Sequence, residues 1–300
     1  MLLSEFVPVV GSSVALGNFD GLHRGHLKVI KNAVSAGEGL EPIVLLFDRH
    51  PLELVSGAAP ARLLSSGTES EIFLNLGITP VVAEFEPLMN MSGEEFFKGI
   101  LIGKLHARVL SCGENYRFGK DAAWGAQELG KLCAESGIRL DILPLESFEG
   151  QPVSSTRIRR ALSDGDIKSA NAMLCEPFSY DFTVVSGDRR GRLLGAPTIN
   201  QHFPDGFIVP RFGVYASKAL VDGEWHASVT NIGVRPTIGY GDYRSETCIM
   251  DFSGDLYGEN IKVALLEFLR PEIKFESLDE LGARIKRDAE TARSVFENEH

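Results

Sequence analysis

The stretch of sequence that decides the fold class is Gly17-Asn18-Phe19-Asp20-Gly21-Leu22-His23-Arg24-Gly25-His26. Directly before it, the apolar residues 14–16 predict the end of a buried strand. Directly after it, residues 27–30 predict the apolar side of a helix. The stretch is therefore predicted to be a glycine-rich loop between a strand and a helix, with two histidines at the start of that helix.

The two histidines of this loop are spaced to act on one ligand. Residues three apart lie on the same side of a helix, so the rings of His23 and His26 can point at one group. Helix N-termini attract anions through their free N–H groups and the helix dipole, and glycine lets the backbone approach a ligand closely. The loop is predicted to be a nucleotide phosphate site, with two purely structural histidines as the alternative.

The first half of the chain alternates strands and helices outward from this loop. Predicted strands cover residues 42–47, 79–83, 108–111 and 139–143, and predicted helices cover residues 69–76 and 92–105. Ser92 and Glu95 have the spacing of a capping box. This alternation predicts an α/β domain, a parallel sheet with helices on both faces. Ligands bind such sheets at the carboxyl ends of the strands, where His23 and His26 are expected.

The pattern changes near residue 180, where short β-prone runs are separated by glycine and proline. The clearest runs are residues 183–185, 213–216, 226–229 and 247–250. Such spacing favours a small antiparallel β-barrel. A final helix is predicted after it, with Ser277 as its cap, Glu280 completing a capping box, and an apolar stripe at Leu281, Ile285 and Ala289.

Length, charge and cysteine content narrow the class of protein. The 300 residues are predicted to form two domains, residues 1–178 and 179–300. Thirty basic and 41 acidic side chains give a net charge of −11, which argues against nucleic acid or an anionic membrane as a partner. No apolar run is as long as a membrane span, and the apolar N-terminus has no basic residue before Arg24, unlike a secretory signal. Four scattered cysteines favour a reduced, cytoplasmic protein over a disulfide or zinc protein.

A second segment, residues 153–159, carries hydroxyls and arginines at the start of a predicted helix. Its serines suit a helix N-cap, and Ile158 and Leu162 are predicted to face inward. Hydroxyls, free N–H groups and guanidinium groups at one helix start form an anion receptor. A capped helix with solvated arginines is the alternative for this segment taken alone.

Together, His23-Arg24-Gly25-His26 and Val153-Ser154-Ser155-Thr156-Arg157-Ile158-Arg159 resemble the two motifs of a nucleotidyltransferase superfamily that binds ATP and releases pyrophosphate. The resemblance implies that His23 and His26 stabilise the charge that builds up as the α-phosphorus is attacked. It implies that Ser155, Thr156 and Arg159 hold the β- and γ-phosphates. The nucleotide contacts that it implies within the loop are Gly17, Phe19, Asp20 and Gly25.

Three further segments resemble the adenylyltransferase module of prokaryotic FAD synthetases. They are residues 46–51, residues 113–119, and Gly165-Asp166-Ile167 with Leu174. The resemblance implies a flavin-binding loop that contains Asn115, Arg117 and Phe118. Asn115-Tyr116 stands where this family usually has Asp-Phe, which removes a charge near the expected flavin edge. An ordinary turn after a strand is the alternative for residues 117–119.

A second candidate site lies in residues 187–200, which combine glycines, arginines and a Thr-x-Asn sequence. Glycines permit close approach of the backbone to phosphate, and the side-chain oxygens of Thr198 and Asn200 suit Mg²⁺. A glycine-rich hairpin turn and a Pro-Thr entry into a strand are the alternatives for the two parts of this run.

This run resembles the riboflavin kinase module, whose hallmark is G-x-P-T-x-N, and residues 212–215, 231–237, 246–252, 256–258 and 274–275 match that module in order. The resemblance implies that Thr198 and Asn200 hold Mg²⁺–ATP, and that Glu246 is the general base for the ribityl 5′-hydroxyl. The nucleotide contacts implied in the glycine-rich part are Gly187, Arg192 and Gly195. Arg270 and Lys274 are candidates for flavin or phosphate contact, with solvated surface charge as the alternative.

The resemblance covers nearly the whole chain and indicates a bifunctional riboflavin kinase and FAD synthetase. The barrel is expected to convert riboflavin and ATP into FMN, and the α/β domain to convert FMN and ATP into FAD and pyrophosphate, both with Mg²⁺. The expected partners are these small molecules rather than nucleic acid or membrane, in a cytoplasmic monomer or weak homo-oligomer. The alternatives are a kinase with a degenerate adenylyltransferase half, and a flavin-binding protein without turnover.

Overall fold

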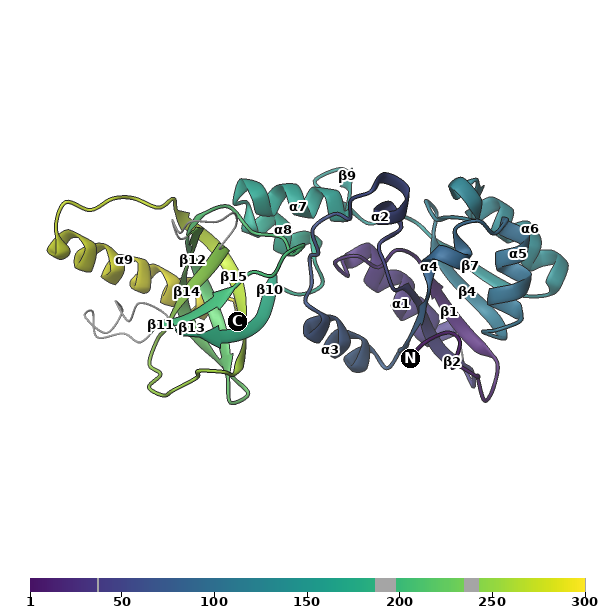
Figure 1. The fold of residues 1–300 in the computed structure, drawn as a ribbon, viewed down its shortest axis with the longest axis horizontal. Coiled ribbons are helices and arrows are strands. Elements are labelled where there is room, and N and C mark those ends of the chain that lie inside the picture. Colours follow the sequence, from purple (N-terminus) through teal and green to yellow (C-terminus); the bar gives the residue numbers. More distant parts are fainter. Residues whose placement is uncertain (37, 187–197, 235–242, 300) are drawn as a thin grey trace. The chain divides into compact units, whose positions relative to one another are not determined.

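The computed structural model describes residues 1–36, 38–186, 198–234 and 243–299. The chain forms two compact units (Figure 1). The first unit consists of Met1–Pro60 and Glu69–Ser154, and the second consists of Ala61–Thr68 and Ser155–His300. Each unit has its own main sheet, which is parallel in the first unit and closed and antiparallel in the second.

The first unit is built on a parallel sheet, as predicted. Its strands are β1 (Ser12–Leu16), β2 (Glu41–Phe47), β3 (Thr79–Ala83), β4 (Ala107–Gly113) and β7 (Arg139–Leu143). Their order across the sheet is β3-β2-β1-β4-β7. The chain therefore builds outward from β1 on one side, and then returns to build the other side from β4. Such a switch point is where ligands bind open parallel sheets.

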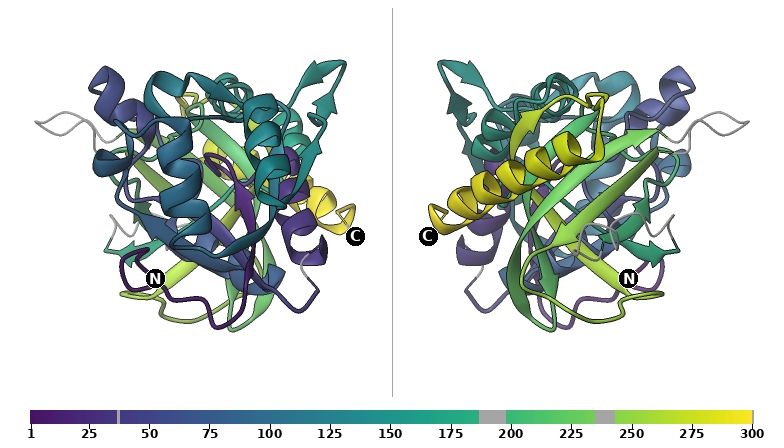
Figure 2. Two further views of the ribbon diagram at one scale, coloured as in Figure 1. Left: turned by 90° about the vertical axis from the view of Figure 1, so that its right-hand side faces the viewer. Right: turned by 90° about the vertical axis from the view of Figure 1, so that its left-hand side faces the viewer.

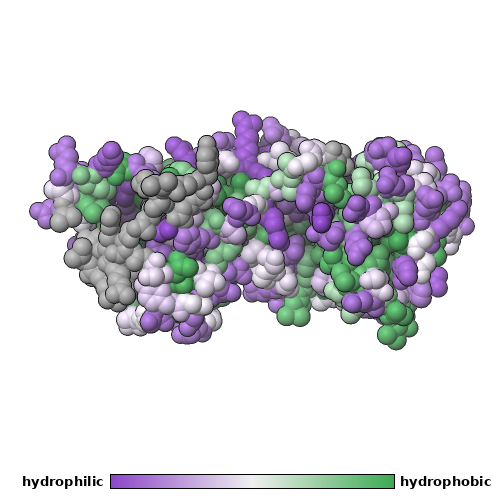
Figure 3. Space-filling model, viewed as in Figure 1, coloured by the Kyte–Doolittle hydropathy of each residue, from purple (hydrophilic) through white to green (hydrophobic). Residues whose placement is uncertain are grey.

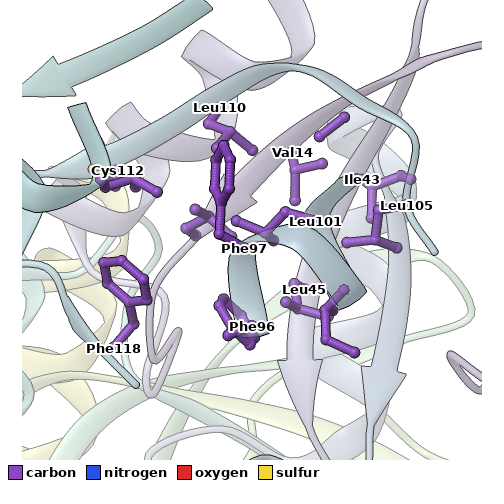
Figure 4. Packing of buried hydrophobic residues seen from close by; sticks show 14 of the residues in the cluster. Val14, Ile43, Leu45, Phe96, Phe97, Leu101, Leu105, Leu110, Cys112 and Phe118 are labelled. Carbon is purple, nitrogen blue, oxygen red and sulfur yellow. The ribbon is translucent and has the colours of Figure 1, made fainter. Parts of the chain in front are cut away.

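Helices cover both faces of this sheet, because its strands carry apolar side chains on both sides. Helix α1 (Arg24–Ala36) buries Val29 and Ile30, and its Asn32 Nδ2 donates to the Ser111 Oγ of β4 at 2.8 Å. Alternation along a strand places Leu110 on the face opposite Ser111. Figure 4 shows that face, where the side chains of Phe96, Phe97 and Leu101 pack with Val14, Ile43, Leu45 and Leu110.

The segment that supplies these aromatic rings begins as predicted but then changes helix type. Ser92 and Glu95 form the predicted capping box, with N–H···O distances of 3.2 and 2.8 Å. The predicted helix over residues 92–105 is present as α5 (Gly93–Glu95), which is α-helical, and η1 (Phe96–Ile102), which is a π-helix and ends three residues early. The segment buries Phe96, Phe97, Ile100 and Leu101 in the core of the first unit.

Shorter elements complete the first unit and its connections. They are α2 (Pro51–Ser56), α3 (Ser66–Leu76), α4 (Phe85–Leu88), β5 (Arg117–Phe118), η2 (Lys120–Ala122), β6 (Trp124–Gly125), α6 (Ala126–Ser136), β8 (Ser147–Phe148) and β9 (Gln151–Pro152). Helix α3 begins three residues before the predicted residue 69. Its start is set by Ser65, whose Oγ accepts a hydrogen bond from the Thr68 N–H at 3.1 Å.

The second unit contains the predicted antiparallel barrel. Its strands are β10 (Ser179–Val185), β11 (Thr198–His202), β12 (Gly213–Val221), β13 (Glu224–Val234), β14 (Tyr243–Ile249) and β15 (Asn260–Arg270). They close in the order β10-β11-β14-β13-β12-β15. Helices α7 (Ser155–Asp164) and α8 (Ile167–Met173) belong to the same compact unit. Closure gives each of the six described strands a partner on both sides, which removes the free edges of an open sheet.

The interior of this barrel contains a chain of buried hydroxyl groups. Ser217 Oγ lies 2.8 Å from both Ser228 Oγ and Thr230 Oγ1, and Thr230 Oγ1 lies 2.8 Å from Thr247 Oγ1. All four residues are buried. Hydrogen bonds in a dry interior are costly to break, so this chain links strands β12, β13 and β14 in one register.

The last helix, α9 (Leu278–Glu297), lies across the barrel (Figure 2, right, yellow) and packs against β12, β13 and β15. Ser277 caps it as predicted, because its Oγ accepts from the Glu280 N–H at 3.2 Å. The predicted reciprocal bond is wrong: the Glu280 carboxylate accepts from the Glu276 N–H at 3.1 Å. The predicted apolar stripe is half-buried, and the most buried side chains of α9 are Asp288 and Ala292. The burial of Asp288 is explained by its charged partner on the barrel, Arg270.

Hydrophilic side chains are spread over the molecular face drawn in Figure 3, with smaller hydrophobic areas between them. Within the part of the chain that the structure describes, no helix combines the length and the apolar character that crossing a membrane requires.

Candidate active sites

The first candidate site is the loop between β1 and α1, which has the predicted strand–loop–helix structure. Strand β1 ends at Leu16 and α1 begins at Arg24, so the loop leaves the carboxyl end of the central strand. The turns that follow β2 and β4 leave the same edge of the sheet, because all three strands are parallel. These turns contain residues 48–50 and 114–116, which come from two of the segments that resemble FAD synthetases.

The two imidazoles of the loop lie against each other, as their spacing predicts. The ring centroids of His23 and His26 are 3.6 Å apart and the ring planes differ by 17°. The His26 N–H donates to His23 Nδ1 at 3.3 Å, so the proton of a neutral His23 ring lies on Nε2. The Phe19 ring packs edge-on against the His26 ring, with ring centroids 5.4 Å apart. The rings therefore form one rigid group.

Both imidazoles are neutral at physiological pH. Burial lowers the pKa of His23 to about 4, although the Asp20 carboxylate and a backbone hydrogen bond oppose this shift. Burial also lowers the pKa of His26 well below its usual value, and the neighbouring His23 lowers it further. His26 Nδ1 is buried and has no hydrogen-bond partner among the described residues. A neutral imidazole with an uncommitted nitrogen is suited to meet a phosphoryl oxygen or the group bonded to it.

The predicted flavin loop follows β4 and is tightly organised. Arg117 Nε donates to the Ala122 carbonyl at 2.8 Å, and its Nη2 donates to the Ala123 carbonyl at 3.2 Å. Phe118 is buried in the core of the first unit, where it stacks on Tyr116 with ring centroids 5.6 Å apart. Asn115 is exposed. In the structure, Arg117 and Phe118 hold the loop, and a direct contact of either side chain with a flavin stays a prediction.

Ser155, Thr156 and Arg159 belong to the second compact unit, where they lie in the first half of α7. Ile158 and Leu162 are fully buried, which confirms the predicted inward face. The Arg159 Nε donates to the Ala61 carbonyl at 2.6 Å. The Ala61 carbonyl is thus one fixed support for this guanidinium group.

The second candidate site is a row of polar residues across neighbouring strands of the barrel. Asn200 on β11 lies opposite Glu246 on β14, and Glu246 lies opposite Asn231 on β13. Residues directly opposite each other in a sheet share a face, so the three side chains point to the same side. Thr198 is two residues before Asn200 and shares this side. Strand register therefore brings the predicted metal ligands and the predicted base together.

The side chains of the polar row differ in their exposure to solvent. Glu246 is exposed, whereas Asn200 is buried. Asn231 Nδ2 donates to Glu272 Oε1 at 3.1 Å, which places a second carboxylate beside the row. Thr198 and Asn200 offer neutral oxygens beside a carboxylate, a donor set that fits Mg²⁺. The predicted nucleotide contacts Gly187, Arg192 and Gly195 lie outside the described residues.

Arg270, a predicted flavin or phosphate contact, is bound to the last helix. Its Nε and Nη2 donate to Asp288 Oδ2 at 2.9 and 2.7 Å, and its Nη1 donates to the Pro271 carbonyl at 3.2 Å. Asp288 is 4% exposed and also accepts from the Arg284 Nε at 3.1 Å. Arg270 thus joins the barrel to α9. Lys274 is exposed, and its predicted contact with a ligand stays a prediction.

Each half of the chain matches the model of a known protein family. A model of the family described as FAD synthetase matches residues 9–157, and a model of the family described as riboflavin kinase matches residues 174–296. A bifunctional riboflavin kinase/FMN adenylyltransferase of Listeria monocytogenes is 33% identical over 294 residues, which cover 96% of this chain and 93% of the relative. The chain belongs to this bifunctional family.

The chain is also similar to a second bifunctional relative and to a solved structure. The bifunctional riboflavin kinase/FMN adenylyltransferase of Escherichia coli K12 is 35% identical over 297 residues, with 96% of this chain and 94% of the relative covered. A crystal structure of a protein from Streptococcus pneumoniae, described as a macrolide-efflux protein, has a TM-score of 0.88 and 29% sequence identity. The match covers 97% of this chain and 96% of that protein, so the two share the whole fold.

Membership in the family confirms the predicted activities. The chain has both enzymatic halves, so it phosphorylates riboflavin to FMN and adenylylates FMN to FAD. ATP, riboflavin, FMN, FAD and Mg²⁺ are the substrates, products and metal of these reactions. The comparisons support the bifunctional prediction and neither of the two alternatives, the kinase alone or the flavin-binding protein.

Three residues at or beside the candidate sites were not assigned from the sequence. His50 contacts the β1–α1 loop, Asn231 lies in the polar row, and Asp288 binds Arg270. His50 and Asn231 lie within segments that resemble the family, so position in a motif was a signal for them. Asp288 had no such signal, because its role depends on how α9 packs on the barrel.

Proposed function

We propose that adenylyl transfer to FMN takes place at the β1–α1 loop, with His23 and His26 as its catalytic residues. The observation that carries this proposal is the stacked pair of imidazoles, buried at His23 and half-buried at His26, whose pKa values are lowered by desolvation. Attack of the FMN phosphate on the α-phosphorus of ATP adds charge to the phosphoryl oxygens. Preplaced donors in a site with little water stabilise that charge more strongly than they stabilise the bound substrate.

The rest of the nucleotide is assigned to the residues that the family resemblance implies. Ser155, Thr156 and Arg159 would bind the β- and γ-phosphates, since a helix start with hydroxyls and a guanidinium group is a strong anion receptor. On this proposal the functional domains are residues 1–178 and 179–300. The adenylyltransferase domain then includes α7 and α8, although both helices pack in the second compact unit.

We further propose that riboflavin is phosphorylated at the polar row of the barrel. Glu246 would accept the proton of the ribityl 5′-hydroxyl, and its exposure leaves room for that substrate. Thr198 and Asn200 would hold Mg²⁺, which supplies charge neutralisation for the transferring phosphoryl group when bound. The register of β11, β14 and β13 supports this assignment, because it aligns the base with the metal ligands.

Product analysis with two variants tests both assignments. His26→Ala is expected to lose FAD formation from FMN by at least about 100-fold and to keep FMN formation. Glu246→Gln is expected to lose FMN formation by about 100-fold or more and to keep FAD formation from added FMN. Lys31→Ala on α1, the helix of His26, and Glu224→Gln on β13, the strand paired with that of Glu246, replace exposed residues and serve as controls. Full FAD formation by His26→Ala, or full FMN formation by Glu246→Gln, would disprove the respective assignment.

We also propose a cytoplasmic location and a monomeric or weakly associating state. The four cysteines are scattered along the sequence, a pattern that suits a protein of a reducing compartment. The net charge of −11 suits a protein whose partners are small molecules held by local donors and Mg²⁺. Cell fractionation and sedimentation of the purified protein over a range of concentrations test these two proposals.

A further inference from the structure

The turn that leads into the first site has an unusual backbone. The Asp20 N–H donates to the Asn18 carbonyl at 2.6 Å, which closes a three-residue turn. Gly21 and Leu22 follow with φ values of 81° and 41°. The left-handed region is common for glycine but costs energy for leucine. Such a backbone persists only where surrounding groups hold it in place.

Two different contacts hold this turn. At the end of the turn next to His23, Leu22 is 1% exposed and is held by core packing. At the other end of the turn, near Asn18, lies His50. This residue follows strand β2, which pairs with β1. The His50 Nε2 is 2.8 Å from the Asn18 Nδ2 and 4.0 Å from the Asp20 Oδ2. His50 therefore reaches across from the neighbouring strand to the two ends of the three-residue turn.

The ring of His50 is itself fixed, and this decides where its proton lies. His50 is the N-cap of α2, and its Nδ1 accepts a hydrogen bond from the Leu52 N–H at 3.2 Å. A neutral ring must then carry its proton on Nε2. The amide of Asn18 has to offer its oxygen to that proton, and the near-identical shapes of amide O and N permit this orientation. His50 thus donates to Asn18, close to the Asp20 carboxylate.

We propose that His50 is a positioning residue for adenylyl transfer, a clamp on the Asn18–Asp20 turn that fixes where His23 and His26 meet the nucleotide. This inference rests on the proposed role of the two histidines. The turn leads to His23 within three residues, and the Asp20 charge acts on the His23 ring. Because a displacement of about 1 Å can reduce a rate by ~100-fold, loosening the turn is expected to lower kcat.

Two substitutions separate the clamp from the helix cap. The amide of asparagine lies as far along the side chain as Nδ1, so His50→Asn can cap α2 but cannot reach Asn18. The amide of glutamine lies as far along as Nε2, so His50→Gln can reach Asn18. We expect kcat for FAD formation from FMN to fall about tenfold in His50→Asn and about threefold or less in His50→Gln, with a smaller change in KM for ATP. A residue that only caps α2 would give the reverse order.

FMN formation from riboflavin, measured on the same preparations, controls for the amount of active protein and is expected to stay unchanged, and Trp124 fluorescence controls for folding of the first unit. Combining His50→Asn with Asn18→Ala is expected to lower kcat no further than Asn18→Ala alone. Unchanged kcat in both His50 variants, the reverse order, multiplied losses in the double variant, or loss of FMN formation would each overturn the clamp. His26→Ala separates the two hypotheses: if it kept FAD formation, the histidine site itself would be wrong.

Discussion

The two candidate sites are held in place in opposite ways. In the first unit, His23 and His26 lie on a loop and on the first turn of a helix, and their rings are packed against each other. In the second unit, Asn200, Glu246 and Asn231 lie on three paired strands. A loop takes its shape from a few side-chain contacts, whereas strand pairing fixes a row of side chains through the backbone. The first site therefore depends on local contacts, and the second depends on the barrel as a whole.

This comparison predicts that the second site is lost when the barrel loses its support from α9. Asp288→Ala removes the buried carboxylate that binds Arg270 and Arg284, and should lower the unfolding free energy of the second unit by about 3–5 kcal/mol, because buried guanidinium charge is left unpaired. The chain has two tryptophans, Trp124 in the first unit and Trp225 in the second. Urea unfolding followed by Trp225 fluorescence in a Trp124→Phe background measures the loss.

Glu290→Ala, at an exposed position of α9, is the matched control for Asp288→Ala and should change the unfolding free energy by less than about 0.5 kcal/mol. Equal stability of the Asp288 and Glu290 variants would show that the Arg270–Asp288 pair does not support the barrel.

The first site should respond to acid more strongly than the second, because desolvation lowers the pKa of both of its histidines. The pKa of His23 is about 4 in the folded chain and about 6.5 when exposed. The unfolded chain therefore binds more protons below pH 6.5, and the unfolding free energy of the first unit should fall as the pH drops from 6.5 to 4. His23 alone accounts for about 3 kcal/mol.

Trp124 fluorescence in a Trp225→Phe background, with urea unfolding between pH 7 and pH 4, measures this loss. His23→Gln should reduce the loss of unfolding free energy between pH 7 and pH 4 by the contribution of His23, about 3 kcal/mol. An identical slope in the wild-type protein and in His23→Gln would contradict the neutral, buried state of the ring.

The polar row should respond to loss of a metal ligand with a shifted Mg²⁺ requirement. Asn200→Ala removes one of the two proposed oxygen ligands, so the Mg²⁺ concentration for half-maximal FMN formation should rise about tenfold, or about 1.4 kcal/mol. Mg²⁺ titration of both reactions checks this, with FAD formation from FMN as the control. If the half-maximal Mg²⁺ concentration shifted equally in both reactions, Asn200 would not be a ligand of the kinase metal.

The smallest predicted effect concerns the cap of α9. Ser277→Ala removes the hydroxyl that accepts from the Glu280 N–H and should cost about 1 kcal/mol in the stability of the second unit. Glu280→Ala should cost less, because its carboxylate bonds only to the exposed segment before the helix. Urea unfolding of both variants checks the order, and a larger loss for Glu280→Ala would contradict it.

The fold could be predicted from the sequence wherever local pattern and packing agree. Strands β3 and β7 have the predicted bounds because short apolar runs between turn residues leave little choice of register. The π-helix of η1 could not be predicted, because the spacing of its buried residues, Phe96, Phe97, Ile100 and Leu101, is also that of an ordinary α-helix. The partner of the Glu280 carboxylate could not be predicted either, because several neighbouring N–H groups are within reach and the Glu276 N–H is the one that donates to it.

The candidate sites could be predicted as far as motifs and spacing reach. The stacking of His23 and His26 follows from their three-residue spacing, and the alignment of Asn200 with Glu246 follows from strand pairing that the barrel imposes. The contact of His50 with Asn18 joins residues that follow two neighbouring strands, so it could be found only once the sheet order was known. Long-range contacts of this kind carry no local signal in the sequence.

The central claim is that one chain holds two independent sites, and mixing two variants tests it most directly. His26→Ala should convert riboflavin only as far as FMN, and Glu246→Gln should convert riboflavin to neither product. If the sites are independent, the mixture of the two proteins with riboflavin, ATP and Mg²⁺ will form FAD, because FMN released by one variant is the substrate of the other. Absence of FAD from the mixture of folded proteins, or FAD from the His26→Ala protein alone, would contradict the account.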